Sequence, residues 1–181
     1  STLSGWLLGG QENFHKHILK LEWFTPTFWK FVLMNSMKVG VIKELPSNNE
    51  SLSYIPYNDR FIMGGNGIPY GNVLRGYDDN RVGPLTASGN PIGGNTLAKF
   101  GVEFRVPFAE NPVVYGMLFA EMGNVWSSTD LMERLSLPRS GPFDLKRSVG
   151  VGVRFFMPMI GMLGFDFARG FDRIDSNGKL K

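Results

Sequence analysis

The sequence predicts an all-β protein whose strands form an antiparallel, up-and-down sheet. Three observations indicate this fold: apolar and polar side chains alternate with period two, aromatic residues and glycine are abundant, and short connections alternate with long ones. Aromatic residues make up 13% of the 181 residues, glycine occurs 23 times, and charged residues account for only 19%. This mixture is typical of pleated sheets, on which aromatic side chains pack well, and unusual for a helical domain.

The clearest strands are three segments with strict alternation: 98–106, 148–157 and 163–168. Successive residues of a strand point to opposite faces, so each segment has one apolar and one polar face. In the first segment, Phe100, Val102 and Phe104 share the apolar face. Glu103 therefore belongs to the opposite, polar face.

Weaker alternation marks the remaining predicted strands: 16–25, 31–43 and 113–126, with residues 1–10 as the end of a further strand. In 113–126, Leu118, Ala120 and Met122 share one face, and Glu121 lies on the other. The sequence therefore predicts about six strands, joined in chain order.

The connections favour a transmembrane β-barrel over a soluble sandwich. Short turns that contain proline are expected at 26–28, 107–112 and 158–160, and long polar loops at 44–92 and 127–146. Barrels of the outer membrane have short turns on one rim and long loops on the other. Aromatic residues near the strand ends would suit interfacial girdles, although edge aromatics in a soluble sheet are equally common: Trp23, Trp29, Trp126 and Phe171. Since no run of about 18 apolar residues occurs, no transmembrane helix is predicted.

Other functional classes find little support in the sequence. The chain contains no cysteine, and its basic residues are scattered at a net charge of +3, so neither a thiolate site nor a nucleic-acid interface is expected. His15 and His17 share a face but have no further ligand nearby. The glycine-rich segment 64–67 is not followed by Lys-Ser/Thr, and no Gly-x-Ser-x-Gly occurs. We therefore expect no catalytic, cofactor or metal site.

The loop 44–92 contains three glycine-rich motifs: 63–67, then Leu74-Arg75-Gly76-Tyr77, then 81–84. With these motifs the sequence resembles the BamA-like family of outer-membrane β-barrel assembly insertases. In this chain Leu74 stands where that family has a valine, and Tyr77 fills the aromatic position of the motif. Further similarity lies downstream at 93–95, 102–104 and 120–126. The similarity runs in order from about Lys16 to Arg173.

The resemblance implies that residues 1–181 are the C-terminal portion only of a transmembrane β-barrel domain, with open edges. It also implies that the loop 44–92 folds into the barrel lumen and that Arg75 pairs there with Glu103 and Glu121. A guanidinium suits bidentate pairing with carboxylates. Gly76 is expected to approach the wall closely or to adopt a positive φ, and Tyr77 either packs against the wall or caps the loop.

The function implied by the resemblance is assembly and insertion of β-barrel proteins into the outer membrane of Gram-negative bacteria, without a cofactor or enzymatic activity. Its partners would be the remaining barrel strands, upstream periplasmic domains, nascent outer-membrane proteins, accessory lipoproteins and the lipid bilayer. Two alternatives stay open: a translocation pore of the two-partner secretion or TamA-like type, and a barrel fused to an upstream hydrolase domain. Asn177-Gly178 predicts a tight turn, so a further strand is expected after it.

Overall fold

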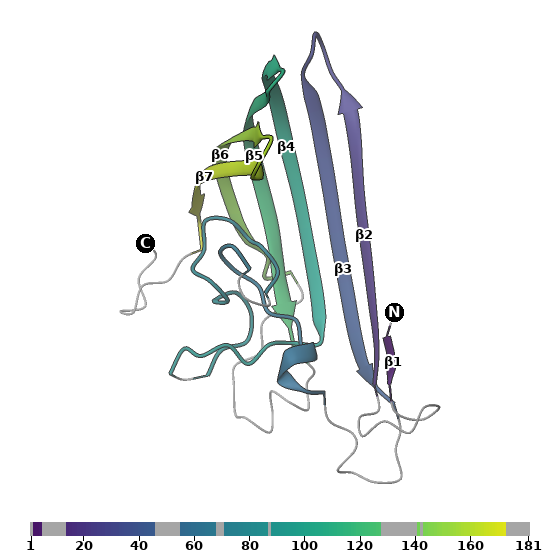
Figure 1. The fold of residues 1–181 in the computed structure, drawn as a ribbon. Coiled ribbons are helices and arrows are strands. Elements are labelled where there is room, and N and C mark those ends of the chain that lie inside the picture. Colours follow the sequence, from purple (N-terminus) through teal and green to yellow (C-terminus); the bar gives the residue numbers. More distant parts are fainter. Residues whose placement is uncertain are drawn as a thin grey trace.

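The protein forms one curved sheet of seven strands in chain order, each antiparallel to the next (Figure 1). The computed structural model describes residues 2–4, 14–45, 55–67, 71–86, 88–127, 141 and 143–172. The strands are β1 (Thr2–Ser4), β2 (Phe14–Pro26), β3 (Val32–Glu44), β4 (Thr96–Glu110), β5 (Val113–Trp126), β6 (Lys146–Met157) and β7 (Gly161–Gly170). A single turn of 3-10 helix, η2 (Tyr57–Asp59), lies between β3 and β4.

The prediction of an all-β, antiparallel, up-and-down fold is confirmed, with differences at strand ends. A turn was predicted over 107–112, but β4 continues to Glu110 and the turn is confined to Asn111 and Pro112. Pro107 is accommodated by a shift of register between Pro107 and Ala109. Such a bulge absorbs a residue that cannot donate a ladder hydrogen bond. The predicted Asn177-Gly178 turn lies outside the described residues.

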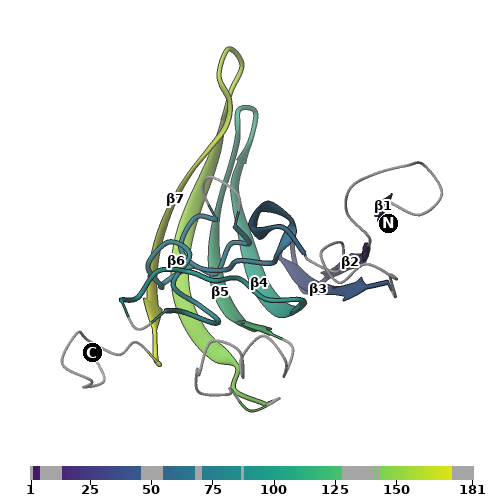
Figure 2. The same cartoon turned by 90° about the horizontal axis from the view of Figure 1, so that it is seen from below.

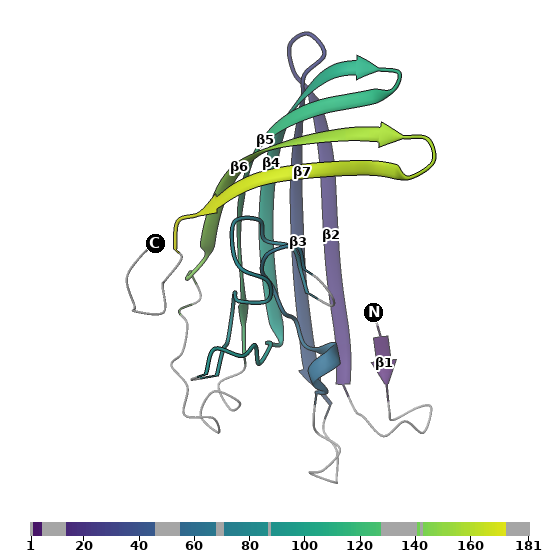
Figure 3. The same cartoon turned by 60° about the vertical axis from the view of Figure 1, so that its left-hand side comes forward.

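The connections divide between the two rims as their lengths predict. The turns between β2 and β3, β4 and β5, and β6 and β7 lie at one end of the sheet, and the long connections lie at the other (Figure 1). The hairpins β4–β5 and β6–β7 bend over at the short-turn end (Figure 3). Among the described strands the sheet is open, with β1 at one edge and β7 at the other.

The two faces of the sheet differ in polarity. One face carries exposed apolar side chains on successive strands: Leu19, Leu21, Trp23, Phe100, Val102, Leu118, Met122, Val149, Val151, Val153, Phe165 and Phe167. The described residues of the segment 55–95 cover part of the other, concave face (Figure 2). Phe100 and Val102 lie on the exposed face and Glu103 on the concave one, as the alternation predicts.

A small hydrophobic core fixes the segment 55–95 to the sheet near the long-loop rim. It joins side chains from the strand ends to side chains from the connection: Phe14, Ile42, Leu97 and Val125 with Ile55, Phe61, Met63, Leu74 and Val82. Burial of such side chains contributes roughly 1.5–3 kcal/mol each. The connection is therefore a packed element of the fold.

Within the described ranges, no helix is long and apolar enough to cross a membrane.

Candidate functional site

The backbone of the long connection between β3 and β4 brings Leu74 and Arg75 to the concave face of the sheet, which forms the inner wall. Met63 forms bridges with both Asn72 and Val82, and Gly65 forms one with Leu74. These bridges fold the segment on itself and place the Leu74 side chain, 0% exposed, in the hydrophobic core. Because Leu74 is fixed there, the next residue starts from a buried position beside the concave face of the sheet.

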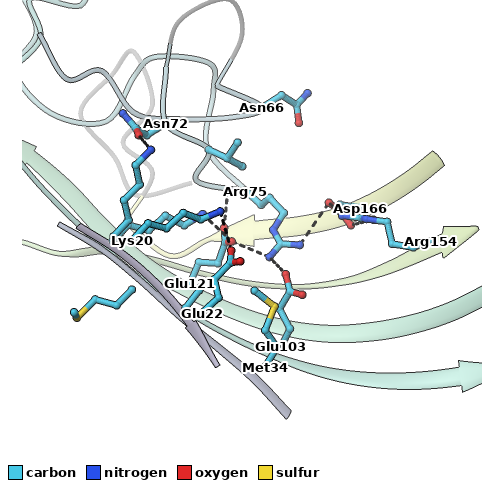
Figure 4. Close-up of a pocket in the computed structure, with 15 residues that line it drawn as sticks. Lys20, Glu22, Met34, Asn66, Asn72, Arg75, Glu103, Glu121, Arg154 and Asp166 are labelled. Atoms are coloured by element: carbon cyan, nitrogen blue, oxygen red, sulfur yellow. Dashed lines mark hydrogen bonds and ion pairs between the residues drawn. The ribbon is translucent and has the colours of Figure 1, made fainter. Parts of the chain in front are cut away.

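Arg75 lies between two carboxylates of the wall (Figure 4). Its Nη2 atom is 2.7 Å from Oε1 of Glu103 and 2.7 Å from Oε1 of Glu121. Its backbone N–H donates to Oε2 of Glu121 at 2.9 Å, so the Glu121 carboxylate binds both the backbone and the side chain of Arg75. The three side chains are 10%, 12% and 4% exposed. The arrangement is a buried, hydrogen-bonded ion triad.

Two further contacts hold the guanidinium in place. Nη1 of Arg75 lies 3.6 Å from Oδ2 of Asp166 on β7. The guanidinium carbon lies 3.5 Å from the centroid of the Phe119 ring on β5, a cation–π contact. Burial by itself would lower the pKa of Arg75, but hydrogen bonds and charge from Glu121 and Glu103 raise it above its usual value. Arg75 is therefore a permanent cation that connects β4, β5 and β7.

The acids that bind Arg75 have cationic partners of their own on the wall. Glu121 accepts from Lys99 Nζ at 3.0 Å, and Glu103 accepts from Arg105 Nη2 at 2.7 Å. Arg154 and Asp166 form a bidentate pair with distances of 2.6 and 2.7 Å. Removing one member of a buried ion pair typically costs about 3–5 kcal/mol, because the other charge is left uncompensated.

Gly76 and Tyr77 attach the loop tip to the ends of β6 and β7. Gly76 has φ +87°, and its carbonyl oxygen accepts a hydrogen bond from the N–H of Gly170 at 3.1 Å. The Tyr77 hydroxyl donates to the carbonyl oxygen of Arg147 at 2.7 Å, with Oδ2 of Asp172 at 3.4 Å. Of the two expectations for Tyr77, contact with the wall is the one observed. Burial, followed by the charge of Asp172, raises the pKa of Tyr77 to about 12.

The remaining candidates, the histidine pair and the glycine-rich segment 64–67, contact neighbouring groups of the protein. The rings of His15 and His17 are tilted by 51° with centroids 5.1 Å apart, and the described residues contain no cluster of three metal-ligating side chains. Gly64 and Gly65 have positive φ and pack against the segment 78–81, where a Cβ on Gly64 would lie 2.5 Å from the carbonyl oxygen of Asp78. The glycines of 64–67 therefore serve the folding of the loop.

A comparison with protein families matches the Omp85 superfamily domain to residues 1–179. The chain belongs to the Omp85 superfamily. Its fold is similar to the crystal structure of BamA from Haemophilus ducreyi lacking POTRA domains 1–3, with a TM-score of 0.74 and 18% sequence identity. The match covers 97% of this chain and 35% of that BamA chain. The sheet of this Omp85 chain is thus an open portion of a barrel wall like that of BamA.

In this Omp85 chain, sequence reasoning named one part of the network and missed another. Arg75, Glu103 and Glu121, named from the resemblance, lie together. Five further residues of the network were not named as site residues: Lys99, Arg105, Phe119, Arg154 and Asp166. Alternation along each strand predicts which face these side chains occupy. Which of them contact one another depends on the register and curvature of the strands.

Proposed function

We propose that residues 1–181 are the C-terminal part of a transmembrane β-barrel domain that assembles and inserts β-barrel proteins into the bacterial outer membrane. Membership of the Omp85 superfamily supports this function. So does a curved sheet with an apolar convex face and a charged concave face. In this proposal the segment supplies barrel wall, and the loop 44–92 is directed into the lumen and acts as a latch.

The single observation that carries the latch is the position of Arg75 between Glu103 and Glu121. Insertion of a client requires a sheet edge that can pair with an incoming strand. While one seam of a barrel opens, the rest of the wall must keep its shape. A buried cation that connects β4, β5 and β7 resists flattening of this wall, and Gly76 and Tyr77 add attachments at the ends of β7 and β6.

The proposed partners follow from the open edges of the sheet and from the proposed location in the outer membrane. In lipid, each unsatisfied backbone group costs several kcal/mol, so the edges of β1 and β7 require remaining barrel strands. Upstream periplasmic domains and accessory assembly lipoproteins would deliver nascent outer-membrane proteins, and the bilayer would contact the convex face. The work is done by strand pairing and burial, and we propose no enzymatic step or cofactor.

The test uses the complete protein that contains this chain, reconstituted in liposomes with a small barrel protein as client. Arg75→Ala should reduce both client insertion and the heat resistance of the folded form in electrophoresis. Arg81→Ala is the matched control, because Arg81 lies in the same connection and binds the Gly89 carbonyl instead of the wall. Wild-type insertion and wild-type heat resistance in Arg75→Ala would exclude the latch.

The same system separates insertion from translocation. If the wild-type protein does not insert the barrel client but exports a soluble protein across the membrane, a translocation pore would replace the proposed function.

A further inference from the structure

Three lysines form a row across the concave face of the sheet. Lys20 on β2 is the Cα partner of Lys38 on β3, and Lys38 is the partner of Lys99 on β4. Directly opposite residues of antiparallel strands share a face, with Cβ atoms about 4.5–5.5 Å apart. Like charges in this arrangement destabilise a sheet. The lysine row (Lys20, Lys38 and Lys99) is therefore a costly arrangement in the absence of a counter-charge.

The partners of the lysine row do not neutralise it. Lys99 shares the Glu121 carboxylate with Arg75. Lys20 pairs with Glu22 at 2.9 Å, but the two side chains are 62% and 38% exposed, and such pairs contribute little. Lys38, at the centre, donates to the neutral Oδ1 atom of Asn72 at 2.6 Å. The middle ammonium is thus fixed by an amide instead of a carboxylate.

The row faces an open cavity of about 460 Å³ between the wall and the loop. Lys20, Lys38 and Lys99 line it together with Asn66 and Asn72 of the loop. Four carboxylates also line it: Glu22 and Glu121 pair with Lys20 and Lys99, and Glu103 and Asp166 pair with arginines. Figure 4 shows the cavity, with Lys20 and Asn72 on one side of Arg75 and with Asp166 on the other. The space accommodates a small anion with bound water beside the lysine row.

We propose that the lysine row binds a small oxyanion of the phosphate class inside the lumen. An ammonium group offers three donors and acts on phosphate as a compact charge. A tetrahedral oxyanion has acceptor atoms for three ammonium groups that approach from neighbouring strands. The site requires the curved sheet and the docked loop but not the insertase function, so phosphate binding tests it independently of the proposed function.

Asn72 makes the site part of the loop attachment. Its backbone N–H and its Nδ2 atom both donate to the carbonyl oxygen of Ile62, at 2.6 and 2.9 Å, so the amide is held rigidly. An anion bound beside Lys38 would contact the wall directly and would be linked to the loop through the hydrogen bond from Lys38 to Asn72. Binding to the folded state alone stabilises it by mass action, so phosphate should raise the thermal midpoint of the complete protein.

The experiment measures binding of labelled inorganic phosphate to the complete protein in detergent by equilibrium dialysis. The wild type should bind phosphate saturably, and Lys38→Met should weaken the affinity by at least about tenfold. Asn72→Asp should weaken it as much, because the new carboxylate takes the place of the anion beside Lys38. Lys30→Met is the control, because Lys30 pairs with Glu110 at the opposite rim and its loss should leave the affinity unchanged.

Thermal midpoints provide the second readout. Without phosphate, Lys38→Met should be at least as stable as the wild type, since repulsion within the row is relieved. Phosphate should raise the wild-type midpoint above that in chloride of equal ionic strength. A short-chain lipid phosphate tests the source of the ligand: tighter binding than inorganic phosphate assigns the site to a lipid headgroup, and weaker binding to the free ion. Absence of saturable phosphate binding, or equal losses in Lys38→Met and Lys30→Met, would overturn the site.

Discussion

The N–H of Gly170, the last residue of β7, donates a hydrogen bond of 3.1 Å to the carbonyl oxygen of Gly76 at the loop tip. The next N–H, that of Phe171, donates to Arg147 of β6. Since successive N–H groups of a strand point to opposite edges, the Gly170 donor points away from β6. The loop tip thus occupies a donor on the free edge of β7. Both partners need to be glycine: a Cβ on Gly76 would lie 2.8 Å from the Gly170 nitrogen, and a Cβ on Gly170 would lie 2.8 Å from the Gly76 oxygen.

Gly76→Ala is therefore expected to detach the loop tip. A residue with a side chain at φ +87° is strained by roughly 1–3 kcal/mol, and its Cβ would also meet backbone atoms of β7. We expect a lower free energy of unfolding in urea and faster proteolytic cleavage within the loop 44–92. Gly141→Ala is the control, because a Cβ there has nothing within 4 Å. Equal cleavage rates in both variants would mean that the tip is not held at Gly76.

Tyr77 should be distinguishable among the five tyrosines by its titration at high pH. Burial raises its pKa from 10.0 to about 12, so the fold favours the neutral phenol. The stabilisation from this shift is complete below pH 10 and is lost as the pH rises through about 12. Ultraviolet titration of Tyr77→Phe should lack the transition near pH 12. In neutral solution the variant should be about 0.5–1.5 kcal/mol less stable, through loss of the hydrogen bond to Arg147. Titration curves identical to those of the wild type would contradict this prediction.

The convex face should reject charge in a way that depends on depth. Val102 lies near the middle of β4 and its side chain is 43% exposed on the apolar face. Val102→Lys should make folding into lipid less favourable by about 2–4 kcal/mol. Met157→Lys, at the last residue of β6 beside a short turn and on the same face as Val153, should cost only about 0–1 kcal/mol. Refolding into vesicles at graded urea concentrations measures both, and equal costs would reverse the assignment of the lipid-facing side.

The strands, their faces and the two rims could be predicted from the sequence because they depend on local patterns. Period-two alternation alone places Glu103 opposite Phe100 and Val102, and proline-containing turns mark the short rim. Thr96 and Glu110 show the limit of this reasoning: the ends of β4 extend beyond the alternating segment, because pairing with β5 continues across the bulge at Pro107.

The candidate site could be predicted only in part. The pairing of Arg75 with two acids came from the resemblance, since nothing local in a loop sequence says where its tip returns. Asp166 joins Arg75 because curvature brings β7 over β5, a relationship across 91 residues of chain, 75 to 166, that no pattern encodes. The lysine row was missed for the same reason, since alternation assigns faces but cross-strand register decides which lysines are neighbours.

Glu121 should contribute more to stability than Glu103, although both bind Arg75 at 2.7 Å. The Glu121 side chain is the more buried, at 4% exposed against 12% for Glu103. It also accepts hydrogen bonds from the backbone N–H of Arg75 and from the ammonium group of Lys99. Glu121→Gln should therefore cost about 3–5 kcal/mol, because two buried cations lose a charge partner. Glu103→Gln should cost less, because Arg75 keeps both contacts to Glu121, and Arg105, the other cation that loses a partner, is 26% exposed. Combining Glu121→Gln with Arg75→Met should cost less than the sum of the two single changes, because the stranded cation is removed together with its partner. Urea unfolding of the four variants and the wild type measures the coupling, and strictly additive costs would show that Arg75 and Glu121 do not act as a pair.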